Sequence, residues 1–209
     1  MTSPDSAPRN LFASQSEVSP ERRAAVAGQR GCVLWFSGLS GSGKSTIARA
    51  LESALIDAGR LPFILDGDNV RLGLNRDLGF SEKDREENLR RVAEVARLMA
   101  DASLIVIAAF ISPLRVSRQQ ARTIIGAERF FEVHVSTSLR TCESRDVKGL
   151  YQRARAGEIA DFTGVSSPFE PPEFPDLEIP TETVGVAEAV RLLIAMLENR
   201  GVFVSRPFP

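Results

Sequence analysis

The sequence has few of the residues that build the commonest catalytic and structural sites. Its 209 residues include one histidine, one tryptophan, one tyrosine and two cysteines. The single histidine, His134, lies within an apolar run, where a buried sheet residue is the simpler interpretation, so a histidine-dependent hydrolase is not indicated. Cys32 and Cys142 form no CxxC or CxxH pattern and lie in or beside apolar runs. We therefore expect reduced core thiols, with no metal site or disulfide.

Long apolar runs and an excess of one charge are also missing. No run approaches the roughly 18 residues of a membrane-spanning helix, and the N-terminus lacks the apolar segment of a secretory signal. The 26 Lys and Arg residues nearly balance the 27 Asp and Glu residues, which leaves a formal net charge of −1. We therefore expect no nucleic-acid partner, no membrane partner and a cytoplasmic location.

The length and composition are typical of one globular domain, with 43% hydrophobic and 25% charged residues. We expect a disordered N-terminal arm over residues 1–18, a single domain over 19–201 and a C-terminal tail over 202–209. Ser19 and Pro20 have the pattern of a helix cap followed by proline at the first helical position, so a short helix is expected to open the domain.

Apolar runs alternate with amphipathic segments along this domain. Strand-like runs cover 33–37, 61–65, 104–110, 130–135 and, more weakly, 177–180, and helical segments cover 44–58, 82–101, 114–126, 138–145 and 185–199. Continuous apolar strands separated by helices indicate an α/β fold, a three-layer sandwich around a parallel sheet of about five strands. Because ligands bind beyond the carboxyl ends of such strands, the residues after each strand are the site candidates.

The most specific motif follows the first strand. Residues 38–46 read Gly-Leu-Ser-Gly-Ser-Gly-Lys-Ser-Thr, which matches the phosphate-binding pattern G-x-x-x-x-G-K-[ST]. The glycines let backbone N–H groups point at phosphate oxygens, Lys44 places a charge near the β/γ-phosphates, and Ser45 can ligate Mg²⁺. With this motif the three-layer sandwich is expected to be of the P-loop NTPase type. We expect a nucleoside triphosphate to be bound by Gly38, Ser40, Gly41, Ser42, Gly43, Lys44, Ser45 and Thr46.

Polar residues also follow the second and third strands. Asp66-Gly67-Asp68-Asn69 comes after the second strand and Ile111-Ser112-Pro113 after the third, which has no terminal aspartate. Asp66 and Asp68 are therefore the candidate carboxylates near Mg²⁺, although such residues also form structural turns. The GTPase motif N-K-x-D is absent, because the nearest string, Asn75-Arg76-Asp77, has the wrong spacing.

The helical segment 82–101 suggests a second binding pocket. Its apolar stripe is continued at the N-terminal end by Arg85, with Asn88 beside it, so both side chains are expected to face inward and contact an acceptor substrate. Segment 147–176 carries Lys148 and several further basic residues, glycines and prolines. We interpret it as a lid over the active site, with an exposed insertion as the alternative.

Together the motifs resemble one family, adenylylsulfate kinase (APS kinase), over about residues 20–200. The strings that carry the resemblance are WFSGLSGSGKST (35–46), LDGDNVR (65–71), GLN (73–75), LGFS (78–81), DREENLRR (84–91), FISP (110–113), CESRD (142–146), KGLY (148–151), ARAGEI (154–159) and FTG (162–164). One departure is Leu72, where a polar residue, often histidine, is expected.

The resemblance implies transfer of the ATP γ-phosphoryl group to the ribose 3′-hydroxyl of adenosine 5′-phosphosulfate (APS) for sulfate assimilation. The products would be 3′-phosphoadenosine 5′-phosphosulfate (PAPS) and ADP, with Mg²⁺ as cofactor. It implies catalytic roles for Lys44, Asp66, Asp68 and Ser112, metal binding by Ser45 and Asp66, directly or through water, and packing of Arg145 against the ATP adenine. The implied APS-binding residues are Asp68, Asn69, Arg71, Phe80, Arg85, Asn88, Ile111, Ser112, Lys148, Leu150 and Phe162. Of these, Phe80 and Phe162 would stack on adenine.

Several alternatives stay open at this point. The roles of Asp66 and Asp68 are undivided. Family members are often described as forming a phosphoserine at the Ser112 position, but we favour direct transfer with Ser112 as a substrate contact, because no activating base adjoins it in sequence. A kinase for another small acceptor, or a silent regulatory nucleotide-binding module, are the competing functions. The family also suggests a homodimer and a functional partnership with ATP sulfurylase.

Overall fold

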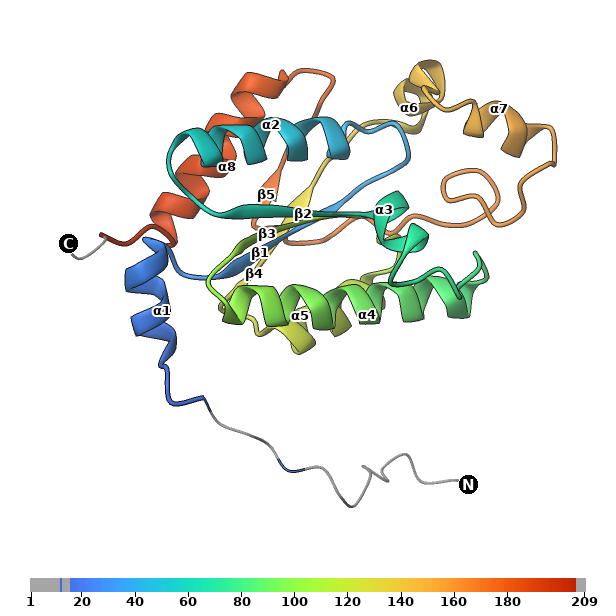
Figure 1. The fold of residues 1–209 in the computed structure, drawn as a ribbon. Coiled ribbons are helices and arrows are strands. Elements are labelled where there is room, and N and C mark those ends of the chain that lie inside the picture. The colour runs from blue at the N-terminus through green and yellow to red at the C-terminus, as the bar shows by residue number, and fades with distance from the viewer. Residues whose placement is uncertain (1–11, 13–15, 206–209) are drawn as a thin grey trace.

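A five-stranded, all-parallel sheet with strand order β2-β3-β1-β4-β5 lies at the centre of the computed structural model (Figure 1). The structure describes Phe12 and residues 16–205. The strands are β1 (Cys32–Ser37), β2 (Pro62–Asp66), β3 (Ile105–Ala109), β4 (Phe130–His134) and β5 (Leu177–Glu178). In this register Ala109 is level with both Phe36 and Asp66, so the carboxyl ends of β1, β2 and β3 meet at one edge. The expected α/β fold and its strand runs are confirmed.

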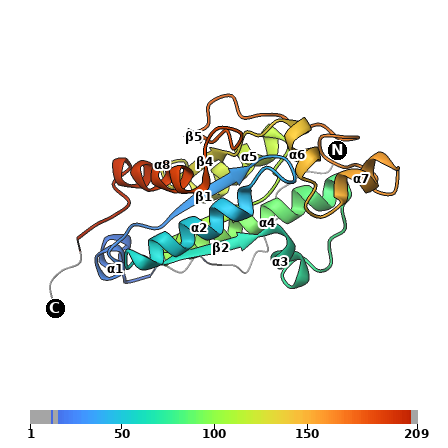
Figure 2. The ribbon, with the colours of Figure 1, turned by 90° about the horizontal axis from the view of Figure 1, so that it is seen from above.

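Helices cover both faces of the sheet. They are α1 (Pro20–Ala27), α2 (Lys44–Asp57), α3 (Gly67–Leu72), α4 (Glu82–Asp101), α5 (Arg115–Ile125), α6 (Leu139–Arg145), α7 (Leu150–Arg155) and α8 (Val186–Asn199). Helices α2 and α8 lie on one face and α4 and α5 on the other (Figures 1 and 2). Every residue of β1 is buried, because Leu34 and Phe36 pack toward α2 and α8 while Val33 and Trp35 pack toward α4 and α5. This two-sided burial explains the unbroken apolar run.

The two ends of the sheet have different roles. Helices α3, α6 and α7 gather beyond the carboxyl ends of the strands, whereas α1 and the C-terminal end of α8 lie at the opposite end (Figure 1). Helix α1 begins as expected, because the Ser19 side chain accepts a hydrogen bond from Arg22 N and Pro20 is the first helical residue. The expected N-terminal arm lies almost wholly outside the described residues, as do residues 206–209.

Residues 202–204, expected in the tail, belong to the fold. Val202 is buried, and its carbonyl accepts a 2.7 Å hydrogen bond from Arg30 N. Val204 N donates to the Gly28 carbonyl at 3.1 Å. The end of the chain therefore pairs with the segment that follows α1, and the boundary of the domain moves a few residues toward the C-terminus.

The proposed lid segment 147–176 is anchored at its C-terminal end. Glu170 N donates to Pro113 O at 2.8 Å, and its carboxylate accepts a hydrogen bond from Arg115 N at 2.8 Å. Asp176 accepts a 2.9 Å hydrogen bond from Glu132 N in β4. The part of the segment without these anchoring contacts is about residues 147–167, and it contains a helix, α7, that composition did not predict. No helix in the described part of the chain is long and apolar enough to cross a membrane.

Candidate active site

The loop between β1 and α2 forms a backbone cradle. Gly38 and Gly43 have φ values of 148° and 108°, in the region that favours glycine. A Cβ at Gly38 would lie 2.6 Å from the carbonyl oxygen of Val135, so space as well as conformation requires glycine there. The loop leads directly into α2, whose N-terminal end favours an anion.

Lys44 lies buried at the base of this cradle. Its Nζ donates to the carbonyl oxygens of Gly38 at 2.8 Å and Leu39 at 2.7 Å, and contacts Ser42 Oγ at 3.3 Å. Burial lowers the pKa of Lys44 to about 8, and the negative charge of Asp66 only partly opposes this effect. The ammonium group is thus held by weak neutral acceptors where phosphate oxygens could replace them.

The acidic turn after β2 reaches the cradle. Ser45 Oγ donates to Asp66 Oδ2 at 3.1 Å, so the two side chains expected to bind Mg²⁺ lie side by side. Asp66 also caps α3, because its Oδ1 accepts a hydrogen bond from Asp68 N at 3.0 Å. The structural and functional interpretations of this turn are therefore compatible. The hydroxyl and carboxylate oxygens have the chemistry that suits Mg²⁺. Over Phe12 and 16–205, no cluster of three or more His, Cys, Asp or Glu side chains offers a self-contained metal cage.

Two threonines that the sequence analysis missed support the loop. Thr137 Oγ1 and Thr181 Oγ1 donate to the Ser42 carbonyl at 3.1 and 3.0 Å. Thr137 follows β4 and Thr181 follows β5, so the strand-end rule that selected Asp66 would have found both.

Arg145, expected beside the ATP adenine, lies at this same edge. It donates to Thr181 Oγ1 at 2.9 Å, to Thr181 O at 3.1 Å and to Gly41 O at 3.3 Å. Tyr151 in α7 holds the loop from the lid side, since its hydroxyl donates to Ser40 O at 2.9 Å. Both side chains therefore connect the cradle to the segments that surround it.

Two arginines gather on the α3–α4 side. The Arg71 guanidinium lies 4.5 Å from the centre of the Phe80 ring and donates to Gly79 O at 2.7 Å. Arg85 donates to Phe80 O at 2.8 Å and, across to the lid, to Asp161 O at 2.6 Å. Burial lowers the pKa of Arg71, and the neighbouring Arg85 lowers it further. Two adjacent cations are suited to an anionic ligand.

The expected inward position of Asn88 is confirmed. It is buried, and its Oδ1 accepts a 2.9 Å hydrogen bond from Asn75 Nδ2.

The two aromatic residues expected to stack on adenine, Phe80 and Phe162, differ in exposure. Phe80 is 67% exposed, whereas Phe162 is buried edge-on against Tyr151 at 5.1 Å between ring centroids. Phe162 therefore belongs to the apolar interior of the lid in this structure.

Ser112 lies beside the start of the cradle. Gly38 N donates to Ile111 O at 3.2 Å, which joins the loops after β1 and β3. Ser112 is buried in a left-handed conformation with φ 45°, and its Oγ accepts a 3.0 Å hydrogen bond from Trp35 Nε1. Trp35 is a core residue, as expected, but it also contacts the site, which its sequence position did not indicate.

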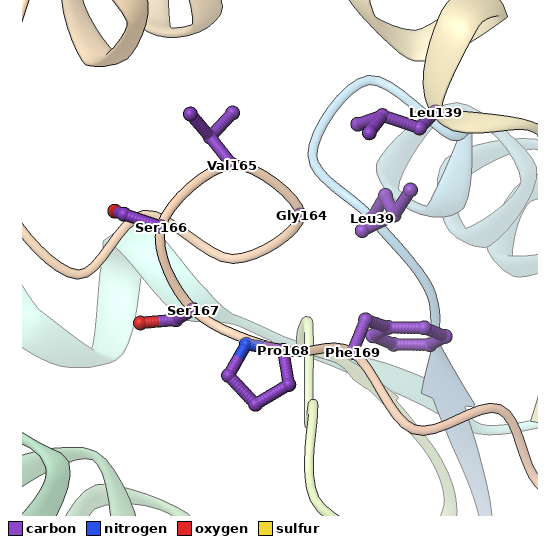
Figure 3. Close-up of a pocket in the computed structure, with 8 residues that line it drawn as sticks. All are labelled: Leu39, Leu139, Gly164, Val165, Ser166, Ser167, Pro168 and Phe169. Carbon is purple, nitrogen blue, oxygen red and sulfur yellow. The ribbon is translucent and has the colours of Figure 1, made fainter.

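The lid borders a cavity of about 510 Å³. Leu39 of the cradle and Leu139 of α6 face the turn at Gly164, and residues 165–169 complete the wall (Figure 3).

Three further residues expected to bind the acceptor lie around the lid and α3. Lys148, at the start of the lid, forms a 2.5 Å ion pair with Asp68. Leu150 is partly buried against the same lid interior. Asn69 is exposed on α3 next to Asp68.

A family model for adenylylsulphate kinase matches residues 30–180. The chain belongs to this family. An adenylyl-sulfate kinase of Shewanella amazonensis is 54% identical over 187 residues, which are 90% of this chain and 94% of the relative. A second, from Vibrio vulnificus, is 52% identical over 197 residues, with 94% and 95% covered. The structure of the Mycobacterium tuberculosis APS kinase in complex with AMPPNP and APS aligns with a TM-score of 0.78 at 48% identity, covering 81% of this chain and 99% of that one.

The geometry of this adenylylsulphate kinase brings most of the expected site residues to one edge. The cradle, Asp66, Ser112 and Arg145 are connected by hydrogen bonds through the loops after the strands. Arg71, Phe80 and Arg85 form a second group, which Arg85 connects to the lid. The resemblance to the family, first given by the motifs, is confirmed.

Proposed function

We propose that this kinase transfers the γ-phosphoryl group of ATP to the ribose 3′-hydroxyl of APS, giving PAPS and ADP. The observation that carries the proposal is the position of the acidic turn after β2. Asp66 contacts Ser45 of the phosphate-binding loop, and Asp68 contacts Lys148 of the lid. One short turn thus connects the donor side of the site with the segment that would close over the acceptor.

The donor side is suited to a metal-bound triphosphate. Ser45 and Asp66 would hold Mg²⁺, either directly or through water, and Mg²⁺ would neutralise charge on the phosphoryl oxygens. Lys44 would exchange its carbonyl partners for phosphate oxygens. Arg145, already beside the loop, would pack its planar guanidinium against the adenine.

The acceptor side is suited to an anionic nucleotide. Arg71 and Arg85 would bind the phosphosulfate group with Asn88 beside them. Phe80 is exposed and available for stacking on adenine, whereas Phe162 would have to leave the interior of the lid. Acceptor binding would therefore be coupled to rearrangement of residues 147–167.

Phosphoryl transfer depends mainly on alignment and charge stabilisation. Asp66 is already engaged with Ser45 and with the N-terminus of α3, so we assign it to the metal side. Asp68 is exposed and contacts only the lid among the described side chains, so we assign it to the acceptor hydroxyl proton. Ser112 would contact the acceptor directly. Its hydroxyl accepts a hydrogen bond from Trp35 Nε1, which is a donor and cannot activate it as a nucleophile.

An acceptor panel tests the assignment. Purified protein with ATP and Mg²⁺ is offered APS, AMP, gluconate or shikimate, and the products are identified by mass spectrometry. Of the four acceptors, we expect only APS to be phosphorylated, with the new phosphate at the ribose 3′ position. Phosphorylation of AMP but not APS would overturn the proposal, and ATP binding with no phosphorylated acceptor would favour a regulatory module.

We also propose, from the family alone, that the protein forms a homodimer and works with ATP sulfurylase. Sedimentation analysis tests the homodimer.

A further inference from the structure

Ser112 is held from two directions by residues outside its own loop. Trp35 Nε1 in β1 donates to its hydroxyl oxygen at 3.0 Å, and Arg118 in α5 donates to its carbonyl oxygen at 2.7 Å. Both contacts are buried, and Ser112 itself is only 2% exposed. Ser112 also has a positive φ, in the left-handed region of the backbone. Residues other than glycine, asparagine and aspartate seldom adopt this conformation.

The contact with Trp35 dictates how the Ser112 hydroxyl can act. An indole N–H only donates, so it occupies a lone pair of Oγ and leaves the hydroxyl proton to point elsewhere. The Trp35 ring cannot readily shift, because it packs against Phe110 and Phe130 with ring centroids 6.0 and 5.8 Å apart. The hydroxyl is therefore set as a hydrogen-bond donor at the edge of the sheet where the loops after β1 and β3 meet.

Arg118 extends this support to the rest of the molecule. It is 3% exposed, and its Nε forms a 2.6 Å ion pair with Glu132 of β4. Its third contact is a 2.7 Å hydrogen bond to the carbonyl of Glu170, where the lid segment is anchored. One guanidinium thus fixes Ser112 relative to the sheet and to the lid anchor.

We propose that Trp35 and Arg118 are positioning residues for the acceptor, which hold the Ser112 hydroxyl so that it donates a hydrogen bond to the bound nucleotide. This inference rests on the proposed function. Preorganised donors of this kind lower the barrier because they need no rearrangement during the reaction. A role in core packing alone would make the same two residues matter for stability but not specifically for the acceptor.

Trp35→Phe tests the contact with the Ser112 hydroxyl, because it keeps an aromatic ring and removes the indole donor. We expect kcat/KM for APS to fall about tenfold while the dissociation constant for ATP, measured without APS, stays within about twofold. Phe131→Leu is the matched control, since Phe131 is a buried aromatic residue of the same strand whose side chain packs on the opposite face of the sheet from Trp35. It should lower the melting temperature without the loss in kcat/KM.

A double-mutant cycle separates positioning from packing. In a Ser112→Ala background the indole has no hydroxyl to hold, so Trp35→Phe should cause no further loss in kcat/KM for APS beyond about twofold. A full tenfold loss in that background would show that Trp35 acts through packing and would overturn the inference.

Arg118→Lys tests the contact with the Ser112 carbonyl. Lysine keeps the charge beside Glu132 but cannot make all three contacts of the guanidinium at once. We expect a fall in kcat/KM for APS of at least about fivefold with an unchanged dissociation constant for ATP. Arg122→Lys, one helical turn further along α5, is the control, since Arg122 contacts Asp176 at 3.2 Å and not Ser112.

The outcomes also separate this inference from the function it rests on. If the unaltered protein phosphorylates APS and both Trp35→Phe and Arg118→Lys match it within twofold, the inference is wrong and the proposed function stands. If the unaltered protein does not phosphorylate APS, the proposed function itself is wrong.

Discussion

The ammonium group of Lys44 is surrounded by carbonyl oxygens rather than by closely bonded carboxylates. Burial lowers its pKa to about 8. A triphosphate would bring full negative charges to within hydrogen-bonding distance and would raise that pKa again. Nucleotide binding should therefore be coupled to uptake of a proton at slightly alkaline pH.

The first prediction concerns this coupling. As pH rises through about 8, free protein increasingly carries neutral Lys44, so ATP affinity should fall with further increase in pH. Titration calorimetry at pH 8.5 in buffers of different ionisation enthalpy should report proton uptake. Lys44→Arg, which stays charged, should abolish the uptake. A binding enthalpy that is independent of the buffer would contradict this account of Lys44.

The second prediction separates direct from covalent transfer. We expect Ser112→Ala to retain turnover within about tenfold, because it loses one substrate hydrogen bond and no nucleophile. ATP made chiral at the γ-phosphorus with oxygen isotopes gives an independent measurement. Inversion of configuration in the product is expected for a single in-line displacement. Retention, together with complete inactivity of Ser112→Ala, would establish a phosphoserine route instead.

At the scale of elements, α3 and the lid meet through the Asp68–Lys148 ion pair. The contact is short, at 2.5 Å, but the side chains are 75% and 61% exposed. Exposed pairs contribute about 0–1 kcal/mol to stability, since water screens them and two long side chains lose freedom. The pair therefore cannot lock the lid, and both groups remain available to substrates.

The third prediction follows from this weak pairing. Lys148→Ala should leave the free energy of unfolding within about 0.5 kcal/mol of the unaltered protein but lower kcat/KM for APS more than tenfold. Chemical denaturation and steady-state kinetics measure the two effects. Arg153→Ala is the control within the lid, since Arg153 pairs with Glu158 at 3.2 Å and is assigned no substrate contact. Equal losses in both variants would count against a specific role for Lys148.

The longer elements could be predicted because their residues carry a repeating pattern. The buried strands and the helices α2, α4, α5 and α8 appear within one residue or so of the expected ranges. Helices α3 and α7 could not be predicted in this way, since each has six residues. Their stability comes from an Asp66 cap in one case and from packing within the lid in the other.

In the candidate site, too, some features could be predicted from the sequence and others could not. The phosphate-binding loop was predictable because its residues are contiguous and each one follows from phosphate chemistry. The contact between Trp35 and Ser112 joins positions 77 residues apart, and Arg118 contacts Glu170 across 52 residues. Such contacts depend on the order of strands and helices in space. Neither composition nor periodicity contains that information.

At the scale of the whole molecule, a buried glutamine ties together the end of the sheet opposite the active site. Gln29 Nε2 donates to Ser103 O at 2.8 Å and Leu61 O at 3.1 Å, and its Oε1 accepts from Leu61 N at 2.9 Å. The segment after α1 is thereby joined to the start of β2 and to the turn before β3. These contacts stabilise the fold without touching either substrate group.

The fourth prediction is that Gln29→Ala separates stability from activity. It removes the hydrogen bonds that Gln29 makes to the Leu61 N–H and to the buried Ser103 carbonyl, so the free energy of unfolding should fall by about 2 kcal/mol. The KM values for ATP and APS should stay within about twofold at temperatures where the variant is folded. Gln120→Ala, on the exposed face of α5, should change neither quantity. A raised KM for APS in Gln29→Ala would show that the two ends of the molecule are coupled.

The central claim is that the glycine cradle and the acidic turn after β2 align a metal-bound triphosphate with a second adenine nucleotide. The rate of ADP formation in the presence of Mg²⁺, with and without APS, measures this most directly. We predict that APS accelerates ADP formation at least about a hundredfold and that Asp66→Asn removes most of the acceleration while ATP still binds. A rate that is unchanged by APS, or an undiminished response in Asp66→Asn, would contradict the account.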